Sequence, residues 1–370
     1  MTIATIFIIS ASYSQIIELF PDGGGDYLVA TRLLSPKLGM FSGCALIIDY
    51  ALTITLSIAS GADAIFSLLP PSMHVWKVPA AVLGIAMLTM LNLRGVKESA
   101  QILAPVFLLF LVTHGFALTY ALVEHSMDAP IVMERLSADV SSAHTELGTA
   151  GLIFLLLRAY SMGAGTYTGL EAVSNGMPML REPRVRTGRR TMVYMGVSLA
   201  VTVIGLMTAY VLYDVRLEPG RTLNATLFTT MTASWPGMLG EAFVVVVLAS
   251  EALLLLVGAQ TGFLDGPRVM SNMALDRWLP SRFAMLSDRL VAQNGILCFS
   301  GAALVIMLAS QGNVSHLVVL YSINVFITFV LSQAGMVRHW WRERAAEKKW
   351  LRKLIINGVG LTSTASILMS

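Results

Sequence analysis

The hydrophobic positions of the chain fall into long, nearly unbroken runs rather than into short amphipathic segments. Most runs are about 20 residues long, the length that an α-helix needs to cross ~30 Å of hydrocarbon. This pattern predicts nine complete or nearly complete membrane spans and a partial tenth. They lie near 2–20, 39–69, 77–93, 100–123, 149–179, 191–213, 237–263, 294–310 and 316–337, and the partial span starts near 354. We therefore expect an all-α integral membrane protein with a single transmembrane domain over residues 1–370.

Composition supports this expectation and excludes several functions. Hydrophobic residues make up 55% of the chain and charged residues only 13%, whereas a soluble domain carries about 25% charged residues. The net charge of +3 is typical of basic loops in a membrane protein and does not indicate nucleic-acid binding. The sequence contains no Ser/His/Asp or Cys/His arrangement that would support hydrolysis, so we do not expect an enzyme.

The positive charges are distributed very unequally between the two ends of the predicted spans. One end receives 20 Lys and Arg residues, in the turns 21–38, 94–99, 181–190, 264–293 and 338–353. The other end receives four, and Arg158 lies within a span. Because Lys and Arg are enriched in cytoplasmic loops, the first end is predicted to be cytoplasmic. The protein is then a multi-pass protein of the cell (inner) membrane, with 124–148 as an external loop.

An acidic residue interrupts the second hydrophobic run, in the stretch "IIDYALTITLSI". Asp49, Thr53 and Ser57 are spaced i, i+4 and i+8, so they share one face of a helix, with Tyr50 beside it. Stacked oxygen side chains suit a hard cation that is losing its hydration shell. The alternative is that Thr53 and Ser57 merely bond to the preceding helical turn while Asp49 pairs with a neighbour.

A second group of polar and small residues lies in "SMGAGTYTGLEAVSNGMPMLREP", within the predicted span 149–179. Gly163, Gly165 and Gly169 crowd its middle, where each costs about 1 kcal/mol relative to Ala. Such a span in a transporter is typical of a broken helix whose unwound backbone binds substrate or ion near the midplane. Thr168 and Glu171 follow the glycines. The alternative is close helix packing through small residues, which leaves Glu171 unexplained.

Four further residues within spans are weaker candidates. Asp63 and Glu251 are isolated acids, and Glu251 is either a proton carrier or the partner of Arg158, which could instead snorkel to the interface. Tyr321 taken alone indicates packing or an interface anchor.

Other residues are expected to be unremarkable. Glu18 and Asp265 fall near cytoplasmic ends, where water solvates them cheaply. Cys44 and Cys298 lie in apolar runs and predict small buried side chains, with neither a disulfide nor a metal site. The "PDGGGDY" stretch at 21–27 indicates a loop at a helix end, and it lacks the features of a phosphate-binding loop.

Several of these stretches resemble the amino acid–polyamine–organocation (APC) superfamily of transporters. The resemblance rests on "ASYSQIIELFPDGGGDYLVATRLLSP", "LIIDYALT", "TGLEAVSNGMPMLREPRVRTGRRT" and "GFLDGPRVMSNMALDRWLPSRF". It implies a LeuT-type fold of inverted five-helix repeats, in which the chain starts at family helix 2 and stops within helix 11. Family helix 1 and the end of the helix 11–12 region would then be missing. We therefore expect that the 370 residues alone do not transport.

Within the superfamily the chain is most similar to proton-coupled potassium importers of the KUP/KimA type. The resemblance implies a potassium site whose ligands match six residues of this chain, with Tyr50 matching the Tyr that follows the first Asp. Those six are Asp49, Thr53, Ser57, Thr168, Glu171 and Tyr321.

The resemblance also implies the coupling and the partners. The coupling ion would be H⁺, carried by Asp49 or Glu171, and no cofactor is implied. The alternative function is a permease for amino acids, cationic amino acids or polyamines. Expected partners are a small cation or amino acid substrate and the lipid bilayer, without nucleic acid, and a homodimer is an assembly that we leave open.

Overall fold

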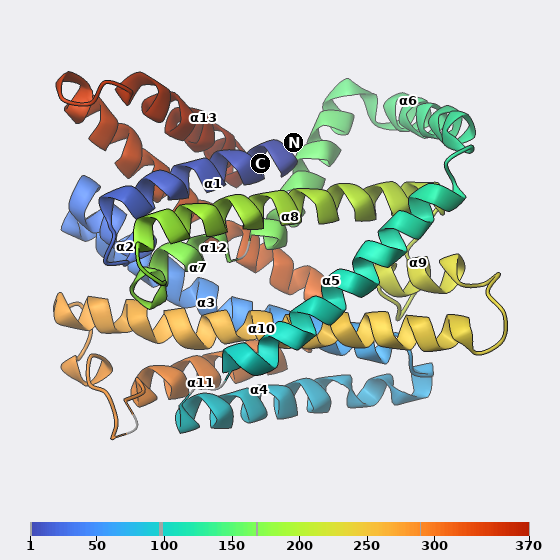
Figure 1. Cartoon of the computed structure of the whole chain (residues 1–370), viewed down its shortest axis with the longest axis horizontal. Coiled ribbons are helices and arrows are strands. Elements are labelled where there is room, and N and C mark those ends of the chain that lie inside the picture. The colour runs from blue at the N-terminus through green and yellow to red at the C-terminus, as the bar shows by residue number, and fades with distance from the viewer. Residues whose placement is uncertain (1, 96–98, 168, 289, 370) are drawn as a thin grey trace.

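The structure is a computed structural model that describes residues 2–95, 99–167, 169–288 and 290–369 (Figure 1). Three residues discussed above, Lys97, Thr168 and Arg289, lie outside the described residues. All the regular elements of the described residues are helices, and nine helical segments are long and apolar enough to cross a membrane. The expectation of an all-α, multi-pass membrane protein is therefore confirmed.

The helices follow the predicted hydrophobic runs closely. The long helices are α1 (Thr2–Leu19), α3 (Pro36–Phe66), α4 (Lys77–Arg94), α5 (Ser99–Glu124), α6 (Ala129–Met162), α8 (Arg184–Leu212), α10 (Leu239–Leu275), α11 (Gln293–Ser310), α12 (Val314–Arg342) and α13 (Trp350–Leu368). The short α-helices are α2 (Gly25–Val29), α7 (Leu170–Asn175) and α9 (Leu223–Met231). Short 3₁₀ or π turns lie at Ala30–Leu34, Pro71–Trp76, Gly163–Tyr167, Met177–Met179, Ser281–Phe283 and Glu343–Ala345.

Helix α3 forms the centre of the bundle. It begins at Pro36, and the preceding Ser35 caps it by accepting the backbone N–H of Leu38 at 3.3 Å. Every residue from Asp49 to Thr55 is buried, and because seven consecutive residues cover all sides of a helix, this part of α3 is enclosed. Helices α10, α12, α11 and α4 pack around it.

The other helices form layers on two sides of α3 (Figure 1). Helices α1 and α8 run side by side, and α13 packs against α1 and α12. On the opposite side α11 lies between α4 and the pair α3 and α10. This arrangement places α1, α3, α7 and α12 around the middle of the bundle, where the predicted site residues lie.

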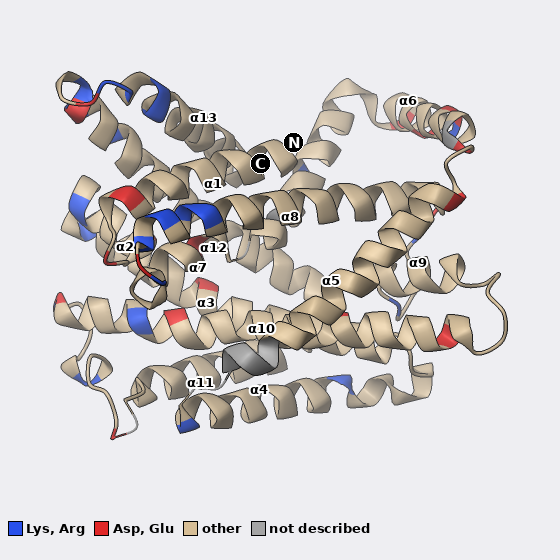
Figure 2. Ribbon diagram, viewed as in Figure 1, with Lys and Arg blue, Asp and Glu red and all other residues tan. Residues whose placement is uncertain are grey.

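The charged residues separate along the long axis of the molecule. Figure 2 shows Lys and Arg gathered at one end, around the starts of α8 and α13, and far fewer at the other end. The same end contains the loops that the sequence predicts to be basic. We call it the basic end of the bundle.

Three local expectations differ from the structure. The predicted loop 124–148 is mostly helical, because α6 begins at Ala129 and changes direction at Gly148 (φ 67°). Helix α10 extends to Leu275, well beyond the apolar run that ends near residue 263. Cys44 and Cys298 are unpaired as expected, but both are exposed, so their predicted burial is wrong. An apolar run does not distinguish the face of a membrane helix that meets lipid from the face that meets protein.

We predict that Gly262 sets the approach of α10 to α3. A Cβ atom at this position would lie 2.7 Å from the backbone O of Tyr50 and 2.6 Å from Cγ1 of Ile54. Replacing Gly262 with Ala should therefore lower the free energy of unfolding by about 1–3 kcal/mol, as overpacking does. Thermal unfolding of the purified protein in detergent measures this change.

Gly258, one turn earlier on α10, is the matched control. A Cβ there would meet only Oγ of Ser57, at an ordinary 3.5 Å, so Gly258→Ala should change stability by no more than about 1 kcal/mol. Equal losses in the two variants would contradict the account of this interface.

Candidate ion-binding site

The structure interrupts the fifth predicted span at its glycines. Helix α6 ends at Met162, a 3₁₀ turn covers Gly163–Tyr167, and α7 runs from Leu170 to Asn175. Gly169 precedes α7 in a left-handed conformation (φ 87°), which non-glycine residues rarely adopt. The break places Glu171 in the first turn of a short helix that contacts α1, α2, α8 and α10.

Asp49 and Glu171 are buried carboxylates without adequate partners. Asp49 is 1% exposed and Glu171 is 5% exposed. Among the described residues, neither carboxylate oxygen of Asp49 nor Oε2 of Glu171 has a hydrogen-bond partner. The two charges are close enough to interact. A buried ionised carboxylate is costly unless it is paired or coordinates a metal, so this arrangement favours a cation between α3 and α7.

Tyr50 links α3 to the broken helix. Its hydroxyl accepts a hydrogen bond of 2.6 Å from Nδ2 of Asn175, at the end of α7, and its side chain also interacts with Glu171. Asn175 in turn packs against Gly25, where a Cβ would lie 2.1 Å from its Oδ1. The glycines of the "PDGGGDY" stretch therefore let the loop approach α7 closely, which positions Glu171 relative to Asp49.

The remaining predicted ligands are only partly brought together. Thr53 is buried below Asp49, and its hydroxyl donates to the backbone O of Asp49 at 2.9 Å, which leaves its lone pairs as acceptors. Ser57 is half-buried and lies near Gly258 of α10, at the edge of the site. Tyr321 is 1% exposed on α12, which packs against α3 and the 3₁₀ turn of the break. The sixth residue, Thr168, lies outside the described part of the chain.

The isolated acids Asp63 and Glu251 have separate structural settings. Asp63 forms an ion pair of 2.7 Å with Lys77 at one end of α3. Glu251 on α10 interacts with Asn224. It forms no ion pair with Arg158, which is exposed on α6 although it lies in an apolar run. The predicted alternative that these two residues pair is therefore wrong.

The two acids expected near cytoplasmic ends differ from each other. Glu18 forms ion pairs with Arg189 at 2.7 Å and with Lys353 at 3.6 Å, and its side chain is partly exposed. Asp265 is 4% exposed and pairs with Arg268 at 3.3 Å, so the expectation that water solvates it is wrong. Asp265 interacts with Glu171 and thus belongs to the same group of buried acids.

Asp26 is the residue near this site that sequence reasoning missed. It lies on α2, between the first two spans, and is 1% exposed. It accepts a hydrogen bond of 2.6 Å from the Tyr13 hydroxyl on α1 and another from the Ser332 hydroxyl on α12. Its charge also acts on Asp49 and Glu171. An acid inside a glycine-rich loop stretch gives no sequence signal for burial, because loops lie mostly at surfaces.

The arrangement can bind and partly dehydrate a small cation. Within the described residues, no group of three or more His, Cys, Asp or Glu side chains could hold a metal ion, so a multivalent, carboxylate-rich metal site is not formed here. Two carboxylates with hydroxyls beside them suit a weakly bound monovalent cation instead, because hard cations take oxygen ligands and fewer anionic ligands bind more weakly.

We predict a pH-dependent contribution of Asp26 to stability. Burial raises its pKa from 3.8 to about 6 in the folded protein, while the hydroxyls of Tyr13 and Ser332 oppose the rise. The folded state therefore favours protonated Asp26 over ionised Asp26. Above about pH 6 the ionised acid lowers the free energy of unfolding by the full amount. Below about pH 4 Asp26 is protonated in both the folded and the unfolded state, and this loss of stability disappears. Asp26→Asn should therefore stabilise the protein at pH 8, by an amount of the order of 3 kcal/mol.

Thermal unfolding in detergent between pH 4.5 and pH 8 measures this gain, which should shrink as the pH falls. The matched control is Asp22→Asn, which alters an exposed acid of the same loop and should show no such trend. A stabilisation by Asp26→Asn that is independent of pH, or that grows toward low pH, would contradict the assignment.

Comparison with known proteins identifies the family of the chain. The family model described as "Amino acid permease" matches residues 1–369. The chain is 36% identical over 358 residues to the potassium transporter KimA of Bacillus subtilis (strain 168), which covers 94% of this chain and 55% of that protein. It is also 29% identical over 96 residues to the low-affinity putrescine importer PlaP of Escherichia coli (strain K12), covering 26% of this chain and 21% of that protein.

The chain thus spans about half the length of the first of these relatives and a smaller share of the second. The permease match, by contrast, runs over nearly all of its 370 residues. The resemblance to the amino acid–polyamine–organocation superfamily is confirmed, and this chain belongs to the amino acid permease family within it.

Proposed function

We propose that this chain forms the membrane part of a secondary active transporter that takes up potassium together with protons. The observation that carries the proposal is the pair of buried carboxylates, Asp49 on α3 and Glu171 on α7, which interact with each other. Among the described residues, both oxygens of Asp49 and Oε2 of Glu171 lack a hydrogen-bond partner. The similarity to a potassium transporter over 94% of the chain supports the same substrate.

The electrostatics of the site favour a cation over a zwitterion. Asp26, Asp49 and Asp265 all act on Glu171. Among the described residues, the only ion pair that involves one of these four acids is that of Asp265 with Arg268. The carboxylate of an amino acid would be repelled by such a site, whereas K⁺ or a protonated amine would be attracted. Thr53, Ser57, Thr168 and Tyr321 are the proposed neutral oxygen ligands, since hydroxyls bind a dehydrated cation without adding charge.

Proton coupling and orientation complete the proposal. Asp49 and Glu171 can alternate between a proton and K⁺, because burial makes it costly for either to stay ionised without a cation. The basic end of the bundle (Figure 2) is assigned to the cytoplasm of a cell (inner) membrane, by the enrichment of Lys and Arg in cytoplasmic loops.

A second candidate is a permease for cationic amino acids or polyamines. The observation that favours it is the similarity of a 96-residue segment to a putrescine importer, together with the family description. A protonated amine would meet the same carboxylates. The two candidates predict different solutes that compete with rubidium for the site.

Rubidium uptake tests the proposal directly. The protein, produced from its complete gene, should accumulate radioactive rubidium in vesicles, and an inward proton gradient should increase the rate. Asp49→Asn and Glu171→Gln should each weaken the apparent affinity about 10- to 100-fold, because contacts to charged groups are worth ~1.5–3 kcal/mol. Excess unlabelled putrescine, lysine or neutral amino acids should leave rubidium uptake unchanged.

The matched control is Asp63→Asn, on the same helix as Asp49 but in a partly exposed ion pair with Lys77, and it should keep near-normal uptake. Normal rubidium uptake by the two site variants would overturn the assigned site. Strong competition by an amine would favour the second candidate. A rubidium uptake rate that does not depend on the proton gradient would contradict proton coupling.

A further inference from the structure

A cavity of about 640 Å³ lies away from the ion site, between α1, α8 and α13. One part of it is lined by charged side chains at the basic end of the bundle: Glu18, Arg189, Glu347, Lys349, Arg352 and Lys353. The other part is lined by Phe7 and Ala11 of α1, Met192 and Val193 of α8, and Ile356 of α13. The cavity therefore has a charged end and an apolar end.

The charged end carries an excess of positive charge. Glu18 is paired with Arg189 at 2.7 Å and Glu347 with Lys353 at 3.1 Å. In the described parts of the chain, Lys349 and Arg352 take part in no ion pair with an acid. The charge of Lys349 acts on Glu347, but the lining as a whole holds four cations against two acids. This excess of positive charge is an arrangement that attracts a phosphate group.

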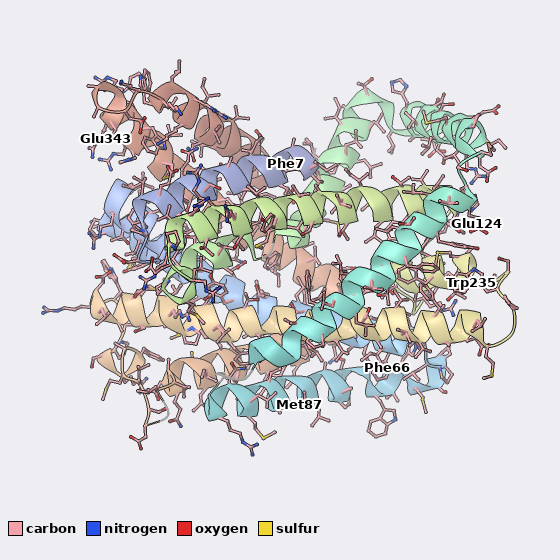
Figure 3. All side chains as sticks on the ribbon, in the orientation of Figure 1. Phe7, Phe66, Met87, Glu124, Trp235 and Glu343 are labelled. Atoms are coloured by element: carbon pink, nitrogen blue, oxygen red, sulfur yellow. The ribbon has the colours of Figure 1, made fainter. Side chains whose placement is uncertain are left out.

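The apolar end opens toward the surroundings of the bundle. Phe7 is 46% exposed and Val193 is 58% exposed, and Figure 3 shows Phe7 on α1 beside α8. The distance along α1 from Phe7 to Glu18 is about 16 Å at 1.5 Å per residue, which matches one leaflet of a ~30 Å hydrocarbon core.

A neighbouring hollow continues the same surface along α8. It shares Ser14, Arg189 and Val193 with the cavity and adds Arg186 and Arg190. Tyr194 lines it with 70% of its side chain exposed, as is usual for an aromatic residue at a membrane interface.

We propose that the cavity between α1, α8 and α13 binds one anionic phospholipid. Its phosphate contacts Lys349 and Arg352, and one acyl chain lies along Phe7 and Val193. A free phosphate would leave the apolar half unused, and a zwitterionic lipid such as phosphatidylcholine would bring its own positive charge next to Lys349 and Arg352. The bound lipid joins α13 to the α1–α8 pair, whatever solute the ion site carries.

Native mass spectrometry of the detergent-purified protein tests this inference, by titration with phosphatidylglycerol and with phosphatidylcholine of the same acyl chains. The protein should retain phosphatidylglycerol preferentially. Lys349→Gln combined with Arg352→Gln should weaken that affinity about 30-fold, because each Lys or Arg near an anionic lipid is worth roughly 1 kcal/mol. Phosphatidylcholine binding should change much less, because the ammonium group of this lipid already offsets the charge of its phosphate.

The matched control is Arg342→Gln combined with Lys348→Gln. It removes two exposed charges from the same connection without touching the cavity lining, and it should keep the preference for phosphatidylglycerol. If the first double variant does not fold, Arg352→Gln alone should weaken binding about fivefold, while Arg352→Lys should keep it.

Three outcomes would overturn the inference. The first is equal retention of the two lipids, unaffected by the double substitution. The second is complete displacement of phosphatidylglycerol by equimolar glycerol phosphate, which would make the site one for a soluble anion. The third is a double variant that keeps its lipid affinity but changes its ratio of monomer to dimer. This result would make the face an interface between two copies of the chain.

Discussion

The functional account depends on the cost of burying a carboxylate with no partner. Inside a membrane protein this cost amounts to several kcal/mol unless a cation, a proton or hydrogen-bond donors compensate it. Asp49 lies in the fully enclosed part of α3, where both of its oxygens lack a hydrogen-bond partner among the described residues. Glu171 adds a second buried acid that interacts with Asp49, and its Oε2 also lacks a hydrogen-bond partner among the described residues. A fold built around these two acids is therefore stabilised when a proton or another cation neutralises them.

The rest of the structure holds the two acids in place. Tyr50 and Asn175 join α3 to α7 by a 2.6 Å hydrogen bond, and the glycine-rich loop packs directly against Asn175. Asp26 fastens that loop to α1 through Tyr13 and to α12 through Ser332. The relative position of the carboxylates is therefore set by five elements, α1, α2, α3, α7 and α12, which come from three separate parts of the chain. A movement of α7 relative to α3 would change it, which is the kind of change that alternating access requires.

The sequence predicts the helices well and the site in part. Span positions follow from hydrophobic runs, because the bilayer imposes their length. Asp49 and Glu171 could be identified because an acid in an apolar run or beside mid-span glycines stands out. Burial could not be predicted for Asp26, in a loop stretch, or for Asp265, near a span end, because tertiary packing decides it. The prediction that Cys44 is buried was wrong for the same reason.

Direct measurement of potassium binding tests the central claim most sharply. For the purified protein from the complete gene, KCl should raise the unfolding midpoint, and a ligand at 100 times its Kd stabilises by about 2.7 kcal/mol. Sodium and choline chloride at equal ionic strength should give much smaller shifts. The account predicts that the potassium-specific shift disappears when Asp49→Asn and Glu171→Gln are combined. An unchanged potassium shift in that double variant, or no shift in the wild-type protein, would contradict it.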